Sequence, residues 1–232
     1  MDLVDHWVVG FSGNRQLNNP EAVRLALREV LQELRKLVDG QLVAMSCIAI
    51  GSDLLFAAEA TNAGLPWICI LPFPEEDFFN ERDFPDASHR QAARQKLALA
   101  GDCEIMRIPR GANEPLDPTW RRTAFADGGF RCVDECDVFI AVFDETNQPA
   151  KPGGTAEVVA YARARKRPIL IVDPGTVQIR QENWPPQWAD ELTESLADLP
   201  AAPVKPSSAP KYPTPRPPAA AGRPTTSAAR PP

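Results

Sequence analysis

The chain has 232 residues, with 25 Lys and Arg against 31 Asp and Glu and a net charge of −6, and this length predicts one ordinary domain or two very small ones. The charge is unevenly spread: residues 200–232 hold 11 of the 25 prolines, five basic residues and no acidic ones, which leaves −11 on residues 1–199. Such an acidic body argues against broad binding to nucleic acid, which depends on clustered Lys and Arg. Every apolar run is also far shorter than the roughly 20 residues that span a bilayer, so we expect no membrane partner.

Cysteine usage and the first residues bear on the cellular compartment. The five cysteines are odd in number, and Cys47 and Cys69 lie inside apolar runs, as buried thiols do in a reducing compartment. Asp2 and Asp5 occupy positions where a signal peptide carries positive charge. We therefore expect a cytoplasmic protein.

Residues 1–199 alternate short apolar runs with longer segments of helical period, which is typical of a parallel sheet covered by helices. The fold class predicted is α/β, with a doubly wound, mainly parallel sheet of about six strands and helices on both faces. Continuous apolar runs such as 138–143 are expected where both faces of a sheet are covered. The predicted strands are 7–11, 42–47, 67–71, 104–108, 137–143 and 168–172.

Helix boundaries follow from capping residues. Asn19 is a cap and Pro20 a first helical residue, and Gly40 ends that helix. The other predicted helices are 53–63, 88–100, 119–133 with an interruption at Gly128 and Gly129, one from the turn at 152–155 to Arg165, and 186–196. The aromatic and acidic stretch 75–86 is predicted to be a functional lid or partly disordered. Residues 200–232 are predicted to form a disordered, partly polyproline-like tail that follows a domain of residues 1–199.

The turn after the first predicted strand offers groups that bind phosphate or ribose. Ser12, Gly13, Asn14 and Arg15 supply a hydroxyl, backbone N–H groups, an amide and a guanidinium. In parallel sheets, ligands bind beyond the carboxyl ends of strands, where the strand order reverses. The alternative is a tight strand-to-helix turn with a surface arginine.

A second turn, with Gly51, Ser52 and Asp53, follows the second strand. Gly51 allows the backbone to approach a ligand closely. Helix capping alone also accounts for Ser52 and Asp53, so both interpretations stay open.

The third turn precedes a helix and carries Gly153, Gly154 and Thr155. Glycines at a helix N-terminus expose N–H groups to an anion, and the helix dipole favours phosphate there. Glu157 is a candidate general base and Asp144 a possible second carboxylate for glycosidic chemistry, although capping and turn formation are the ordinary roles of these residues. These residues form the catalytic hypothesis.

Arg110 follows the fourth strand and is a candidate for added positive charge, with a solvated loop as the alternative. His6 and His89 lack metal-ligand spacing, and Cys132 and Cys136 lack a second ligand pair nearby. We expect no metal and no cofactor.

Taken together, residues 10–15, 50–53, 70–74 with Pro72, and 137–144 followed by 153–157 resemble the SLOG superfamily. The superfamily contains Rossmann-like binders of nucleotides and nucleotide sugars, related to the Lonely-guy phosphoribohydrolases and to the DNA-processing protein A fold. Lonely-guy enzymes carry PGGxGTxxE, whereas this chain has Pro-Gly-Gly-Thr-Ala-Glu from residue 152 and Asn14 where relatives often carry His. The resemblance thus implies a nucleotide-derived ligand more strongly than turnover, and it implies a homodimer.

The leading hypothesis is a sensor or regulatory module that binds a nucleotide or ADP-ribose-type ligand, with phosphate near Ser12, Arg15 and Gly154. The alternative is an N-glycosidic hydrolase or deoxyribosyltransferase-like enzyme that acts on a nucleoside 5′-monophosphate, with Glu157 and Asp144 as carboxylates. A third hypothesis is an interaction module whose proline-rich tail binds proteins.

Overall fold

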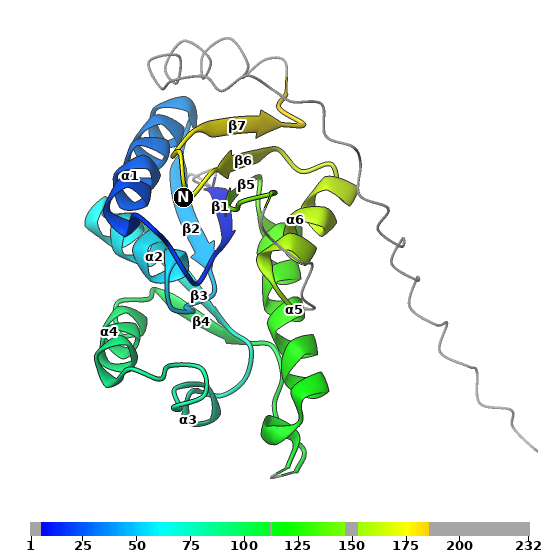
Figure 1. The fold of residues 1–232 in the computed structure, drawn as a ribbon. Coiled ribbons are helices and arrows are strands. Elements are labelled where there is room, and N and C mark those ends of the chain that lie inside the picture. The colour runs from blue at the N-terminus through cyan, green and yellow to red at the C-terminus, as the bar shows by residue number, and fades with distance from the viewer. Residues whose placement is uncertain (1–5, 112, 147–152, 186–232) are drawn as a thin grey trace, which may run out of the picture. The chain divides into compact units, whose positions relative to one another are not determined.

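The computed structural model describes residues 6–111, 113–146 and 153–185, which form an α/β unit around one sheet (Figure 1). The sheet has seven strands in the order β4-β3-β2-β1-β5-β6-β7, parallel throughout except for the antiparallel β6–β7 pair. The predicted class, a Rossmann-like and mainly parallel α/β fold, is confirmed. The strands are β1 His6–Gly13, β2 Gln41–Ser46, β3 Trp67–Leu71, β4 Asp102–Ile105, β5 Val138–Val142, β6 Ile169–Val172 and β7 Ile179–Glu182.

The strand prediction was wrong in two places. It missed β7, because the sequence Ile-Arg-Gln-Glu is too polar to suggest a strand. Ion pairs lie on this edge of the sheet, where Glu182 pairs with Arg163 at 2.7 Å and with Arg180 at 3.0 Å. It also placed the fourth strand too late. β4 begins at Asp102, which is the register partner of Ile68 in β3, and not at residue 104.

Helices cover both faces of the sheet, with α1 and α2 on one side and α5 and α6 on the other (Figure 1). Asn19 caps α1 as predicted, since its Oδ1 accepts the Ala22 N–H at 3.1 Å. No helix among the described residues is long and apolar enough to cross a bilayer. The predicted helix 186–196 and the tail from residue 200 lie outside the described residues. The helices are α1 Pro20–Leu37, α2 Ser52–Asn62, α3 Glu75–Phe78, α4 Ala87–Leu97, α5 Pro118–Glu135 and α6 Thr155–Ala164, with a 3₁₀ turn at Glu114–Leu116.

The predicted break at Gly128 and Gly129 does not occur, because α5 runs through both residues without interruption. A Cβ on Gly128 would lie 3.1 Å from the Cys47 Sγ, and one on Gly129 would lie 2.4 Å from Val158 Cγ2. The glycines therefore bring α5 close to β2 and α6, and this packing outweighs their low helix propensity.

The stretch 75–86, predicted to be a lid or partly disordered, is instead packed into the protein. Phe78, Phe79 and Phe84 are all buried, and their rings contact one another with centroids 5.2–5.3 Å apart. The buried Asp83 carboxylate pairs with the buried Arg121 guanidinium of α5. Burial of these aromatic rings stabilises the packing of the segment against the rest of the protein.

Candidate functional site

The candidate site lies where the strand order reverses. From β1 the chain continues to β2, β3 and β4 on one side of the sheet and then returns to β5 on the other side of β1. The loops that follow β1 and β5 therefore diverge at the carboxyl ends of these two strands. The space between such loops is the usual ligand position in open α/β sheets. A pocket of about 530 Å³ opens at this edge, and its lining includes Ser12, Gly13, Asn14, Arg15, Gln16, Cys47, Ala49, Ile50, Asp53, Pro72, Phe78, Phe125, Gly129, Gly153, Gly154, Thr155, Ala156 and Val158.

The turn after β1, residues 12–15, contributes polar groups to one part of this pocket. The Asn14 backbone N–H donates to the Val142 carbonyl of β5 at 3.0 Å and so fixes the turn at the switch point. Arg15 is exposed, and its guanidinium carbon lies 5.3 Å from the centre of the Phe125 ring. No described carboxylate forms an ion pair with Arg15. Its charge is therefore available to an anionic ligand.

The N-terminus of α6 contributes backbone donors to the same pocket. Gly153 has φ +77°, and a Cβ there would lie 2.7 Å from the Arg122 carbonyl oxygen, so the position requires glycine. Gly154 is the N-cap and has no side chain to cap the helix. The backbone N–H groups of Thr155 and Ala156 have no acceptor among the described residues, so they and the positive end of the helix dipole are open to an anion.

The turn at residues 51–53 supports the turn that follows β1. The Ser52 hydroxyl and backbone N–H both donate to the Asn14 carbonyl, at 2.9 and 3.1 Å. A Cβ on Gly51, which has φ +90°, would lie 2.3 Å from the Arg15 carbonyl oxygen. Gly51 and Ser52 therefore support the β1 turn from behind, and neither is among the lining residues of the pocket.

Asp53 lines the pocket and is nearly buried, with 6% of its surface exposed. Burial raises the pKa of this carboxyl from 3.8 to about 7, although the Ala49 N–H, the Arg15 charge and the Gly13 N–H act in the opposite direction. The Ala49 N–H donates to Oδ2 at 3.1 Å. Near neutral pH, Asp53 can therefore either donate or accept a proton.

The two predicted catalytic carboxylates are not brought into the pocket. Glu157 accepts the Gly153 backbone N–H at 2.6 Å and so caps the start of α6. Asp144 accepts the backbone N–H and hydroxyl of Thr146 at 2.8 and 2.7 Å, which is an ordinary turn arrangement. Neither residue is among the pocket's lining residues.

Of the two remaining predicted ligand residues, one lines the pocket and one does not. Pro72 is buried and lines the pocket at the end of β3. Arg110 is exposed in the loop before the 3₁₀ turn, where its backbone N–H donates to Glu114 Oε2 at 2.7 Å. Its position matches the solvated-loop interpretation.

The sequence did not indicate the aromatic side of the pocket. Phe78 of α3 and Phe125 of α5 both line it, and their ring centres lie 6.1 Å apart. Both pack on Phe73, with ring centres 5.6 Å from its own. Phe78 belongs to the stretch predicted to be a lid, and Phe125 carries no motif, so only tertiary packing reveals this surface.

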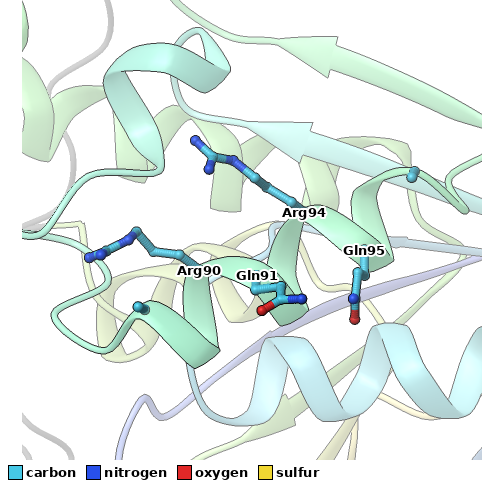
Figure 2. Close-up of a pocket in the computed structure, with 6 residues that line it drawn as sticks. Arg90, Gln91, Arg94 and Gln95 are labelled. Carbon is cyan, nitrogen blue, oxygen red and sulfur yellow. The ribbon is translucent and has the colours of Figure 1, made fainter.

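A second depression lies along α4, where Arg90, Gln91, Arg94 and Gln95 project from one helix (Figure 2). Arg90 donates to the Phe84 carbonyl at 2.6 Å, and Arg94 pairs with Glu75 at 3.4 Å. These arginines thus tie α4 to the segment 75–86. Within the described ranges, no three His, Cys, Asp or Glu side chains gather as metal ligands do.

No family model and no curated protein sequence matches the chain. Among solved structures, DNA processing protein A (DprA) from Streptococcus pneumoniae matches with a TM-score of 0.47 and 16% identity, over 83% of this chain and 55% of that chain. The chain thus spans about half the length of this protein.

Proposed function

We propose that the pocket binds a nucleotide or a nucleotide sugar of the ADP-ribose type, and that the protein acts as a sensor or regulatory module. The observation that carries this proposal is the N-terminus of α6, where the backbone N–H groups of Thr155 and Ala156 have no acceptor among the described residues and share one pocket with the cation of Arg15. A helix N-terminus and a guanidinium are both established ligands of phosphate.

The phosphate end of the ligand is assigned to Gly154, Thr155 and Arg15. Each hydrogen bond from these donors to a charged oxygen contributes about 1.5–3 kcal/mol. The Thr155 hydroxyl adds one more donor beside the helix N-terminus. Because the remainder of residues 1–199 is strongly acidic, this local positive region favours a compact anion over an extended polyanion.

The nucleoside end is assigned to the aromatic side of the pocket. The half-buried Phe125 offers ring surface for a planar base, with the buried Phe78 packed behind it, and the Asp53 carboxyl offers a partner for a ribose hydroxyl or a base N–H group. A volume of about 530 Å³ lies within the range of small-molecule sites.

Isothermal titration calorimetry with AMP, ADP, ADP-ribose, NAD and inorganic pyrophosphate tests the proposal. We expect at least one nucleotide to bind, with affinity about tenfold weaker in Arg15→Ala, since one charge-assisted contact is lost. Arg110→Ala is the matched control, because Arg110 is an exposed arginine outside the pocket, and it should bind as the parent protein does. Absence of binding across the panel, or equal losses in the two variants, contradicts the proposal.

Cleavage of an N-glycosidic bond is a second candidate function, and the position of Asp53 favours it. A pocket carboxyl with a pKa of about 7 can protonate a departing base. Chromatography of nucleoside monophosphates after incubation with the protein detects release of the base. Turnover that is lost in Asp53→Asn and kept in Glu157→Gln supports this function, whereas binding without products leaves the sensor function alone.

A further inference from the structure

Two thiols lie side by side on the outermost parallel strands of the sheet. Cys69 in β3 and Cys103 in β4 are register partners. Neighbouring strands lie about 4.8 Å apart, and a disulfide requires Cα atoms roughly 4.4–6.8 Å apart. Because register partners on parallel strands present their side chains on the same face, the Cα atoms of this pair fall within that range with both side chains on one side of the sheet.

The two thiols affect each other's pKa. The neighbouring Cys69 thiol lowers the pKa of Cys103. The Cys103 thiol, together with burial, raises the pKa of Cys69 well above its usual value. Cys103 is therefore the one of the two that forms the reactive thiolate more readily, with a protonated thiol beside it.

Cys103 is also open to small molecules. β4 is an edge strand, and Cys103 is exposed while Cys69 is fully buried. Cys103 lines a surface depression of about 510 Å³ together with Leu97, Ile105, Glu75, Glu76 and Asp102. Three carboxylates at this depression disfavour an anionic oxidant such as glutathione disulfide, so its chemistry suits a small uncharged oxidant.

We propose that Cys103 is a modification site for hydroperoxides and that Cys69 is its resolving partner. The Cys103 thiolate attacks one peroxide oxygen, so that an S–O bond forms, the O–O bond breaks, and the leaving oxygen takes up a proton to become water or an alcohol. The sulfur is oxidised by two electrons to sulfenic acid as the peroxide is reduced. The Cys69 sulfur then attacks the Cys103 sulfur; an S–S bond forms, the S–O bond breaks, and the thiol proton leaves with the hydroxide as water.

The other thiols lack this combination of exposure and partner. Cys132 in α5 and Cys136, the residue that follows α5, are both buried, and the Cys136 thiol donates to the Val133 carbonyl at 3.4 Å. Cys47 is half-buried and hydrogen-bonds Cys132, whose pKa is raised by that bond and by burial. A peroxide of low reactivity should therefore select Cys103.

The test uses the reduced full-length protein treated with a slight excess of hydrogen peroxide or tert-butyl hydroperoxide. Free thiols are then alkylated, and the peptides are mapped by mass spectrometry. The expected result is a Cys69–Cys103 disulfide with the loss of two titratable thiols. Oxidation spread over all cysteines, or a Cys47–Cys132 disulfide formed first, overturns the proposal.

Two variants separate the roles of the partners. Cys103→Ser should lose thiols at least about tenfold more slowly than the parent. Cys69→Ala, with its fold checked by circular dichroism, should stop at a sulfenic acid on Cys103 that dimedone traps. Rapid thiol loss in Cys103→Ser, or no dimedone adduct on Cys103 in a folded Cys69→Ala protein, also overturns it. Nucleotide binding plays no part in these measurements, so they stand apart from the proposed function.

Discussion

Two glycine-led turns at the carboxyl edge of the sheet look alike in sequence and differ in what their donors do. The α2 turn, residues 51–53, follows β2, and the α6 turn, residues 153–155, precedes α6. In the α2 turn, Ser52 gives both its donors to the Asn14 carbonyl, whereas Thr155 of the α6 turn has no acceptor among the described residues for its hydroxyl or its backbone N–H. A glycine turn is thus a candidate ligand site only where the protein has left its donors unused.

The two turns are nevertheless coupled through the β1 turn. The α2 turn packs beneath Asn14 and Arg15, with Gly51 against both of their carbonyl oxygens. The β1 turn, in turn, presents Arg15 to the pocket that the α6 turn lines. One glycine turn therefore has a supporting role and the other a proposed binding role, and changes in the two should affect different measurements.

The largest effect expected from a substitution at constant pH is on stability, from a change in the supporting turn. Gly51→Ala places a Cβ 2.3 Å from the Arg15 carbonyl oxygen at φ +90°, so both a clash and backbone strain arise. We expect a loss of about 3 kcal/mol in the free energy of unfolding, measured by urea denaturation.

Gly64→Ala is the matched control for this variant. Gly64 also has a positive φ, +71°, but a Cβ there meets nothing within 4 Å. Only the left-handed backbone then costs energy, about 1 kcal/mol. Equal losses in the two variants would show that the close packing of Gly51 against the β1 turn contributes nothing.

The second prediction concerns the binding turn and affects affinity instead of stability. Thr155→Pro removes the backbone N–H of the first residue of α6, a position where proline is well tolerated. Gly154 has φ −100° and ψ 168°, the region that a residue before proline prefers. If that N–H binds phosphate, we expect nucleotide affinity to fall about 30-fold, or about 2 kcal/mol, by calorimetry.

Thr155→Ala keeps the N–H and removes only the hydroxyl, so it separates the two donors. We expect a smaller loss from this variant, of about fivefold. If both variants stay folded and bind nucleotide as the parent does, the α6 turn does not bind the ligand. The α6 turn would then have no binding role that the α2 turn lacks.

Much of the fold was predictable because the interior strands carry their own signal. β3 and β5 are continuously apolar and covered on both faces, and Asn19 with Pro20 fixes the start of α1. β7 was missed because an edge strand held by ion pairs has no apolar pattern. The glycines of α5 were misread because a helix-breaking residue and a close-packing residue look the same until the neighbouring helix is in place.

The site was predictable to a lesser degree. The turns at 12–15 and 153–155 line the pocket, since strand ends in a parallel sheet must meet at one edge. The sequence could not show that the Glu157 carboxylate accepts the Gly153 backbone N–H, because a carboxylate in the first helical turn is equally typical of capping and of catalysis. Nor could it show that Phe125 lies in the pocket, because this depends on how α5 crosses the sheet.

The third prediction concerns the Asp53 carboxyl at the buried end of the α2 turn and the dependence of the protein's stability on pH. Its pKa is raised from 3.8 to about 7 by burial, so the folded state holds this proton more tightly than the unfolded chain. The stability linked to the proton is fully present below about pH 4 and is lost as pH rises through about 7. Relative to Asp53→Asn, the parent should lose up to about 1.4 kcal/mol of unfolding free energy per pH unit in this window. Parallel urea-stability profiles for the two proteins would show that Asp53 is ionised in the folded state throughout.

The smallest expected effect comes from Glu157, and it bears on whether the α6 turn binds or also catalyses. Glu157→Gln keeps an oxygen that can accept the Gly153 N–H and removes the negative charge from the first turn of α6. We expect a loss of about 0.5–1 kcal/mol in unfolding free energy. Nucleotide affinity should stay within about twofold or rise slightly, because a negative charge near the anion site is removed. A large loss of nucleotide affinity would instead show that Glu157 acts directly in the site. A large loss of base release, where turnover is found, would show the same, because capping of α6 alone explains neither loss.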